Sequence, residues 1–255
     1  MVGPELLQEY LMRRFNVSPN DIEGSEATLR GSEAHHLRDV LRLKPGARIT
    51  LFDGTGATYE GEIDRLSGDT VTVRIEKKNE ADDNRPRLHL GQALITGKKI
   101  DLVVQKATEL GIASITPFSS TYCSARPPGP NRRERWQRIA LESCKQCSRP
   151  SPPVIAEPAT ILHCFQEASR HDLKIIFWEE SADFTLKDIE NIIRRESPDS
   201  VFFMVGPEGG LTDEEVAAAK EFGFLSVTLG RQILRAETAS IAAGAIIQYL
   251  LGNLD

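Results

Sequence analysis

The sequence predicts an α/β protein in which a mostly parallel sheet, covered by helices on both faces, follows a smaller antiparallel β domain. Beyond residue 88, short apolar strands alternate with helical segments, which is the pattern of a parallel sheet. Within residues 48–76, apolar and polar residues alternate between turn sequences, which indicates the hairpins of a small antiparallel sheet or barrel. The polar run 77–87 is the expected linker, so the domains are predicted at residues 1–77 and 88–255.

The first domain is expected to hold one helix among short strands. Residues 14–17 form a candidate strand, and a helical segment begins at Ser32, with Glu33 in its first turn where the helix dipole favours a carboxylate. Pro45-Gly46 ends this segment. The apolar residues at helical spacing are Leu37, Val40, Leu41 and Leu43. Three strands are then predicted at residues 48–52, 57–66 and 70–76.

The second domain is expected to alternate strands and helices along its whole length. A Pro-rich bend at residues 150–153 interrupts the alternation. The predicted strands are residues 88–95, 114–118, 173–178, 200–205 and 225–229. The predicted helices are residues 99–110, 132–147, 161–168, 186–195 and 213–222, with a last helix from about Glu237.

The composition is that of an ordinary soluble protein. The 255 residues are 27% charged and 40% apolar, and a chain of this length can bury a sizeable core. The most apolar segment, residues 239–251, is too short to span roughly 30 Å of hydrocarbon and contains Gln248. Because no secretory signal pattern is recognisable, we expect a cytoplasmic protein without a membrane partner.

The cysteines do not predict a disulfide framework or a metal site. Cys144 and Cys147 form a C-x-x-C, but they lie inside a helical pattern and no second cysteine pair or nearby histidine pair accompanies them. Cys123 and Cys164 are isolated. We expect all four to be ordinary residues and no metal to be bound.

Charge is segregated along the chain. The net charge of −6 argues against nucleic-acid binding by the whole surface. Residues 126–149, however, carry seven Lys or Arg against two Glu, or +5, whereas residues 179–222 carry four basic against twelve acidic residues, or −8. A local basic face therefore remains available in an acidic protein.

Two loops near the carboxyl terminus predict a ligand site. Each follows an apolar strand and leads into a helix, and the carboxyl ends of neighbouring strands are where open α/β sheets bind ligands. The first, Gly206-Pro-Glu-Gly-Gly210, precedes a capping box of Thr212 and Glu215. Its acidic residues disfavour a polyphosphate and no phosphate-binding motif is present, so a neutral or cationic ligand fits better. A plain strand-to-helix turn is the alternative.

The second loop, residues 230–238, combines apolar and charged side chains. Ile233 and Leu234 could flank a flat ring or could plug the core beneath the loop. Arg235 could fix a base or a carboxylate with its planar fork, or could serve only as an ion-pair partner of Glu237.

Several motifs together resemble one family. The stretches Met204-Val-Gly-Pro-Glu-Gly-Gly-Leu-Thr212 and Leu229-Gly-x-x-Ile-Leu-Arg-x-Glu-Thr-Ala239 are similar to the ribosomal small-subunit RNA uridine-N3 methyltransferases of the SPOUT, or trefoil-knot, superfamily. The segments 35–46, 105–111 and 135–142 resemble further signatures of that family. The resemblance covers nearly the whole chain, and the motifs in combination are specific.

The resemblance implies a fold, a cofactor and an assembly. It implies a deep trefoil knot in the second domain, a PUA-like barrel in the first, a homodimer formed through the second domain, and S-adenosylmethionine held by three loops. By the same resemblance, the cofactor-binding residues are Trp178, Glu179, Val205, Gly206, Pro207, Glu208, Gly209, Gly210, Leu229, Gly230, Ile233, Leu234, Arg235 and Thr238.

The implied reaction is methyl transfer to N3 of a uridine in small-subunit (16S) ribosomal RNA, either free or in the assembled subunit. Arg235 is expected to stabilise the negative charge that develops on the base, with Glu237 orienting Arg235 or acting as the base. The candidate RNA-binding residues are Arg14, His36, Arg38, Arg42 and Arg149. Alternatives are a related enzyme acting on another base or on a ribose 2′-hydroxyl, and a non-catalytic RNA-binding or ribosome-assembly protein.

Overall fold

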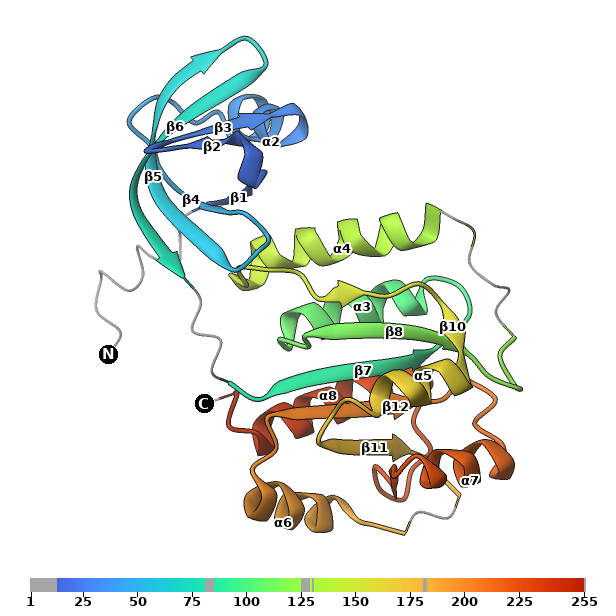
Figure 1. Cartoon of the computed structure of the whole chain (residues 1–255). Helices are drawn as coiled ribbons and strands as arrows, with labels where there is room; N and C mark the ends of the chain where they lie inside the picture. Colours follow the sequence, from blue (N-terminus) through green and yellow to red (C-terminus); the bar gives the residue numbers. More distant parts are fainter. Residues whose placement is uncertain (1–12, 81–84, 125–128, 130, 181–182, 255) are drawn as a thin grey trace. The chain divides into compact units, whose positions relative to one another are not determined.

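The computed structural model describes residues 13–80, 85–124, 129, 131–180 and 183–254. By its internal contacts the chain divides into two compact units. Unit 1 comprises residues 1–83 with 141–152, and unit 2 comprises residues 84–140 with 153–255 (Figure 1).

Unit 1 is built on a six-stranded sheet in the order β1-β4-β5-β6-β3-β2. β1 and β4 are parallel, and every other neighbouring pair is antiparallel. One face carries the core of the unit, with Phe15, Leu51 and Ile63 fully buried. The strands are β1 (Arg14–Asn16), β2 (Ile22–Glu23), β3 (Glu26–Arg30), β4 (Arg48–Phe52), β5 (Ala57–Ser67) and β6 (Thr70–Glu80).

The helical segment of unit 1 is shorter and less regular than predicted. It consists of α2 (Gly31–His35) and a π-helical turn at His36–Val40, and a short 3-10 turn lies at Pro19–Asp21. The expected continuation to Leu43 does not form, because Arg42 adopts a left-handed φ of 51°. Leu41 and Leu43 still pack against the core, but from outside the helix.

Two further features of unit 1 differ from the prediction. The first residues of the expected linker, Lys77 to Glu80, belong to β6, where they pair with residues 57–60 of β5. The β2–β3 hairpin was not predicted, although Ala27 and Leu29 alternate with exposed or half-buried neighbours. Backbone pairing with a neighbouring strand, rather than local hydrophobicity, makes both segments extended.

Unit 2 is built on a parallel sheet in the order β10-β8-β7-β12-β11-β13, with β9 also paired to β8. All of its strand pairs are parallel. The strands are β7 (Arg87–Ala93), β8 (Ser114–Ser119), β9 (Val154–Ile155), β10 (Ala159–Thr160), β11 (Leu173–Phe177), β12 (Ser200–Val205) and β13 (Leu225–Val227). The predicted parallel sheet is therefore confirmed, with the two short strands β9 and β10 added and β13 ending earlier than expected.

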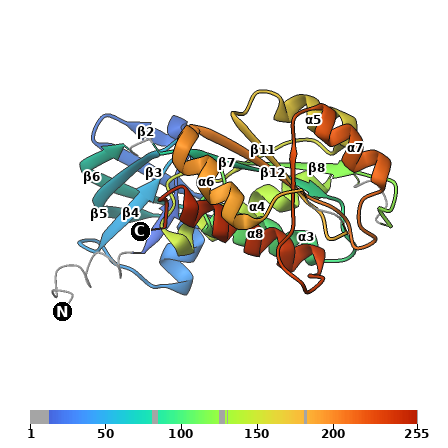
Figure 2. The same cartoon turned by 90° about the horizontal axis from the view of Figure 1, so that it is seen from below.

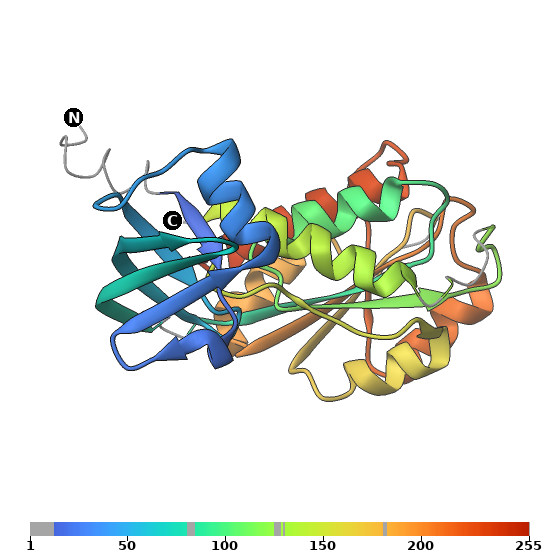
Figure 3. The same ribbon diagram turned by 90° about the horizontal axis from the view of Figure 1, so that it is seen from above.

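Helices cover both faces of this sheet, and the alternation along β12 shows how. Val201, Phe203 and Val205 face one core cluster, which contains residues of α3, α4, α6 and α8, whereas Phe202 and Met204 face a second cluster with α5 and α7. Figures 2 and 3 show α3 and α8 on one side of the sheet and α5 and α7 on the other. The helices are α3 (Lys99–Glu109), α4 (Asn131–Cys147), α5 (Ile161–Ala168), α6 (Leu186–Glu196), α7 (Asp213–Glu221) and α8 (Ala236–Leu250).

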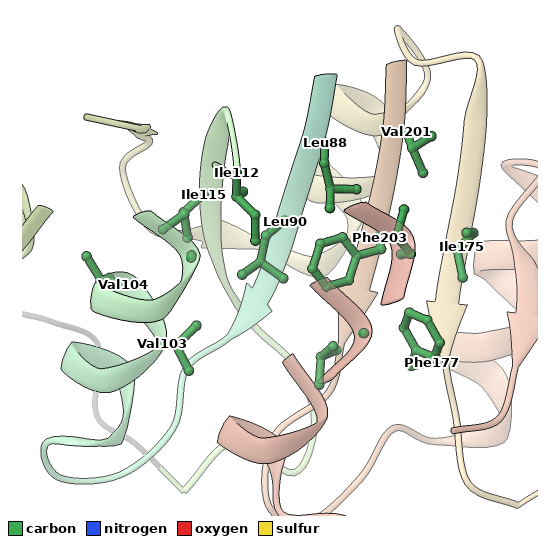
Figure 4. Close-up of a cluster of buried hydrophobic side chains, with 14 of the residues drawn as sticks. Leu88, Leu90, Val103, Val104, Ile112, Ile115, Ile175, Phe177, Val201 and Phe203 are labelled. Carbon is green, nitrogen blue, oxygen red and sulfur yellow. The ribbon is translucent and has the colours of Figure 1, made fainter. Parts of the chain in front are cut away.

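The first cluster is the larger core of unit 2 (Figure 4). Leu90 of β7 and Phe203 of β12 are fully buried at its centre, beside Val103 and Val104 of α3. β-branched and aromatic residues dominate the strands because they pack well on a pleated surface. This core fixes the carboxyl ends of β11, β12 and β13 at one edge of the sheet. None of the helices in the described part of the chain combines the length and apolar character needed to cross a membrane.

Candidate functional site

A cavity of about 400 Å³ lies where β11, β12 and β13 end. These three strands are neighbours in the sheet and parallel, so the loops that follow them meet at the same edge. The lining residues are Lys99, Phe177, Trp178, Glu179, Val205, Gly206, Pro207, Glu208, Gly210, Leu211, Thr228, Leu229, Gly230, Arg231, Gln232, Ile233, Leu234, Arg235, Ala236 and Ala239.

The loop after β12 has room only for glycine at three positions. A Cβ on Gly206 would lie 2.9 Å from Cγ of Leu211, and one on Gly210 would lie 2.8 Å from Oε1 of Glu179. Gly210 also has a left-handed φ of 78°. A Cβ on Gly209 would lie 2.8 Å from Cβ of Tyr122, so the backbone is packed closely on both of its sides.

Glu208 anchors this loop to the segment between β7 and α3. Its Oε1 accepts hydrogen bonds from the Thr96 amide at 3.0 Å, the Thr96 hydroxyl at 2.8 Å and the Lys99 ammonium at 2.8 Å. Partial burial is the largest influence on the pKa of Glu208 and acts to raise it, but the bonds from Lys99 and Thr96 outweigh it and lower the pKa to about 2. The carboxylate is therefore ionised, and its Oε1 is engaged by three donors.

The predicted capping box is confirmed at the start of α7. The Thr212 hydroxyl accepts from the Glu215 amide, and the Glu215 carboxylate accepts from the Thr212 amide at 3.0 Å. The other oxygen of Glu215 accepts from the Thr121 amide and hydroxyl at 2.8 and 2.9 Å. The acid that sequence reasoning counted as repelling an anion is thus used to hold two loops together.

The loop after β13 is far less constrained. Ile233 is 82% exposed, so it does not plug the core, and that alternative is wrong for this residue. Leu234 is half-buried, and both residues line the cavity. Gly230 has a φ of 116°, and its amide is 3.4 Å from the Thr228 hydroxyl.

Arg235 and Glu237 are separated by the start of α8. Arg235 is exposed, lines the cavity and occupies the N-cap position, where its side chain makes no capping bond. Among the described residues, no ion pair joins Arg235 to Glu237. One carboxylate oxygen of Glu237 is buried without a hydrogen-bond partner, and Glu237 does not line the cavity. The alternative in which Arg235 serves only as an ion-pair partner of Glu237 therefore has no support in the structure.

The cavity carries charges of both signs, although the sequence of the first loop is acidic. Its charged lining consists of two carboxylates, Glu179 and Glu208, and three cations, Lys99, Arg231 and Arg235. Mixed charges suit a ligand that carries both signs, and the apolar lining suits a flat ring. The indole nitrogen of Trp178 is buried at the cavity edge without a hydrogen-bond partner.

The residues predicted to bind the cofactor are largely brought together. All of them line the cavity except Gly209, which faces Tyr122, and Thr238, which is exposed on α8. Sequence reasoning missed Lys99, Arg231 and Gln232. Lys99 follows β7 at the same sheet edge, and this position at a strand end was the signal that could have identified it.

The candidate RNA-binding residues of unit 1 differ in their surroundings. Arg14 on β1 is half-buried with its guanidinium carbon 5.6 Å from the Phe52 ring centroid. Its Nε and one Nη are buried without a hydrogen-bond partner, and burial lowers its pKa. The nearby Cys147 and Cys144 oppose this shift.

The other candidates are more exposed or already engaged. Arg38 binds both carboxylate oxygens of Asp39 and the carbonyl of Gly68. Arg38 lies in the π-helical turn, whereas Arg42 lies beyond it in a left-handed conformation. His36 is exposed, with its ring edge-on to Phe15 at 6.2 Å.

Arg149 lies near the same thiols as Arg14. Burial is the main cause that lowers its pKa, and Cys144 and Cys147 oppose this shift. Burial raises the pKa of the Cys144 thiol to about 12, which makes it unreactive. All four cysteines are free, and the described residues contain no cluster of three or more His, Cys, Asp or Glu that could hold a metal ion.

Comparison with known proteins gives matches over most of the chain. Residues 82–248 match the model of the RNA methyltransferase domain, and residues 29–76 match that of the RNA methyltransferase PUA domain. A ribosomal RNA small subunit methyltransferase E from Buchnera aphidicola subsp. Schizaphis graminum is 33% identical, with 89% of this chain and 92% of the relative covered.

Solved structures agree with these matches. The structure of a ribosomal RNA small subunit methyltransferase E from Neisseria gonorrhoeae, bound to S-adenosylmethionine, superposes with a TM-score of 0.82 at 33% identity and covers 94% of this chain and 98% of its own. A Legionella pneumophila protein in complex with the same cofactor has a TM-score of 0.82 at 30% identity, with 93% and 97% coverage.

Proposed function

Since this chain belongs to the RNA methyltransferase family, we propose that it transfers a methyl group from S-adenosylmethionine to N3 of a uridine in small-subunit ribosomal RNA. Its relatives support an S-adenosylmethionine-dependent enzyme acting on small-subunit ribosomal RNA. The choice of N3 comes from the motifs of residues 204–212 and 229–239. The observation that carries the proposal is that these two motifs line one cavity.

The cavity fits S-adenosylmethionine, which when bound supplies an electrophilic methyl group and carries no phosphate. Gly206 and Gly210 line the cavity without side chains, so a ligand can approach the backbone of this loop closely. Val205, Leu229 and Leu234 offer apolar contacts to an adenine ring. The mixed charges of the lining match a ligand with a carboxylate, an ammonium and a sulfonium.

The residues of the second loop would act on the uracil. N3 of neutral uracil carries a proton, which must leave before or during attack on the methyl group. Arg235 is exposed at the cavity, where its guanidinium can stabilise the negative charge that develops on the uracil oxygens. Glu237 would orient Arg235 or accept the proton after a rearrangement that frees its buried oxygen. The target base must be unpaired, because N3 lies on the Watson–Crick edge.

The path of the chain supports a knot in unit 2. β13 lies at the sheet edge beyond β11, whereas α8 packs against α3 and β7 nearer the centre. The segment 228–235 that joins β13 to α8 must therefore cross the ends of β11 and β12, where the other two loops lie. We propose that it passes through them as a trefoil knot, and that residues 1–77 and 88–255 are the PUA and knotted domains.

We further propose a cytoplasmic homodimer formed through unit 2. One side of α8 presents Ile241, Ala245 and Ile246, which are only half-buried, and Tyr249, which is 67% exposed. An apolar stripe of this kind on a soluble protein fits a subunit contact. Light scattering of the wild type and of Tyr249→Glu tests it: a dimer that the substitution converts to a monomer supports the contact.

The RNA contacts are proposed to include Arg14, His36, Arg38, Arg42 and Arg149, with Arg14 as the sharpest test. We expect Arg14→Met to raise the melting temperature by about 2–4 °C, because it removes a half-buried guanidinium whose Nε and one Nη have no hydrogen-bond partner among the described residues. The same change should weaken RNA binding and reduce its salt slope by about one, because one phosphate contact is lost. Arg30→Met, an exposed arginine paired with Asp21, is the control. A lower melting temperature with unchanged RNA affinity would contradict this role.

The reaction is tested by nucleoside mass spectrometry. Small-subunit RNA is prepared from a strain that lacks this protein and from the same strain complemented with it. N3-methyluridine should appear only on complementation. A methylated ribose or another methylated base would identify a different reaction of the same superfamily, and no new methylated nucleoside would leave a non-catalytic RNA-binding protein as the better description.

A further inference from the structure

We propose that Lys99, oriented by Glu208, binds an oxyanion inside the cavity. The oxyanion is either the carboxylate of the cofactor's methionine part or a uracil oxygen that gains charge as N3 loses its proton. This inference rests on the proposed function and names a contact of the same site that its motifs do not contain.

Lys99 reaches the cavity from an element that is distant in sequence. It is the first residue of α3, and its ammonium lies 2.8 Å from Oε1 of Glu208, 109 positions further along the chain. Its side chain is 37% exposed and lines the cavity. The neighbouring Lys98 is exposed and does not line the cavity. Two adjacent lysines therefore have different surroundings, and only one faces the ligand.

Glu208 fixes the direction of this ammonium. Its Oε1 already accepts hydrogen bonds and is therefore not available to a ligand. The same Oε1 accepts the two bonds from Thr96, so three donors converge on one carboxylate oxygen. A carboxylate held in this way is a poor general base, because the donors stabilise its ionised form. Its contribution is to hold Lys99 at the cavity.

The ammonium of Lys99 can donate further hydrogen bonds. It has three N–H donors, and the bond to Glu208 takes one of them. The described part of the chain shows no other hydrogen bond to this nitrogen. A half-exposed ammonium in a confined cavity binds an oxygen anion most strongly, since charge-assisted hydrogen bonds are about twice as strong as neutral ones. Because Lys99 lies in a helix and is bound to Glu208, its position is better defined than that of Arg231 in the exposed loop.

The experiment compares Lys99→Met with Lys98→Met, which removes the same charge one residue away. Lys99→Arg tests rescue by a cation, and Glu208→Gln tests orientation, since the amide oxygen can still accept from Thr96 but carries no charge. Titration calorimetry measures the affinity of each variant for S-adenosylmethionine and for its decarboxylated analogue. Single-turnover methylation at saturating cofactor and RNA is measured as a function of pH. Melting temperatures establish that the variants are folded.

Either of two results supports the inference. If the anion is the cofactor carboxylate, Lys99→Met should weaken S-adenosylmethionine binding about 10- to 100-fold and leave binding of the decarboxylated analogue equal to that of the wild type. If the anion is the uracil oxygen, cofactor affinity should stay unchanged, and the single-turnover rate should fall about 100-fold and recover partly as the pH rises. In whichever measurement Lys99→Met shows the loss, cofactor affinity or single-turnover rate, Glu208→Gln should show a smaller loss. Lys99→Arg should retain part of the affinity or rate that Lys99→Met loses.

The inference would be overturned if Lys99→Met were folded and had the same cofactor affinities and the same single-turnover rate as Lys98→Met. The calorimetric arm needs no turnover, so it separates this inference from the proposed function. If the wild type bound the cofactor but methylated no small-subunit RNA, the proposed function would fail. The role of Lys99 would then be tested by the affinities for S-adenosylmethionine and for its decarboxylated analogue alone.

Discussion

The two loops that form the cavity are built in opposite ways. The loop after β12 is held by Glu208 with three hydrogen bonds, by the capping box of Thr212 and Glu215, and by close backbone packing at its glycines. The loop after β13 has an exposed isoleucine, Ile233, and leads into a helix whose N-cap, Arg235, makes no capping bond.

This difference indicates a division of roles. The first loop is shaped before a ligand arrives and so defines the space that the cofactor can occupy. Few contacts among the described residues hold the second loop, and loops of this kind open and close at low cost. We therefore expect cofactor binding to order the loop of residues 228–235 and to bring Ile233 and Arg235 onto the ligands.

The largest effect is expected in the second loop. Arg235→Ala should lower the single-turnover rate about 100-fold, because the charge developing on the uracil loses a fixed cation. The melting temperature should change little, since Arg235 is exposed. Rapid-quench measurement with saturating RNA checks this. Arg195→Ala, which replaces an exposed arginine on α6, is the control. An unchanged rate in Arg235→Ala would contradict the role of Arg235 in stabilising charge on the uracil.

The next effect tests the shape of the first loop. Gly209→Ala places a Cβ 2.8 Å from that of Tyr122 and 3.2 Å from its carbonyl oxygen, so the backbone must shift. Overpacking of this kind costs about 1–3 kcal/mol, which should appear as about 10- to 100-fold weaker cofactor binding in calorimetry. Gly129→Ala is the matched control, because a Cβ there would have no atom of the described residues within 4 Å. Equal affinities of the two variants would mean that the first loop is not preshaped.

A smaller effect tests whether the second loop closes. Ile233→Ala should leave the melting temperature of the ligand-free protein unchanged, because the side chain is 82% exposed. Cofactor affinity should fall about 10-fold, since part of the apolar contact with the ligand is lost. Leu162→Ala, an exposed apolar residue on α5 away from the cavity, is the control. A lower melting temperature without a change in affinity would show that Ile233 serves the fold alone.

The smallest effect concerns pH. The pKa of Glu208 is lowered from 4.5 to about 2, so its stabilisation is complete above pH 4.5 and is lost as the pH falls toward 2. The urea midpoint of the wild type should therefore exceed that of Glu208→Gln by a constant amount above about pH 5. The difference should shrink as the pH is lowered from there. A difference independent of pH would contradict the anchoring role of the ionised carboxylate.

The sequence by itself determined the order of the main strands and helices of unit 2, without the short strands β9 and β10, and most of the cavity lining. Residues 201–205 are apolar throughout, which predicted a strand buried on both faces, and the Thr212–Glu215 box marked the start of α7. Such signals are local: they depend on residues a few positions apart, so they can be read along the chain. The glycine loop and the apolar loop could be placed at one site because parallel strands share an edge.

Only the tertiary structure decided which distant residues meet. The bond between Lys99 and Glu208 joins positions 109 apart, and Gly209 turned out to face Tyr122 rather than the cavity. Residues 77–80 became strand because β5 offered a pairing edge, although their charged side chains predicted a linker. These outcomes depend on the order of strands in the sheet and on the direction of each loop. Both are set by packing between elements far apart in the chain, which no local pattern encodes.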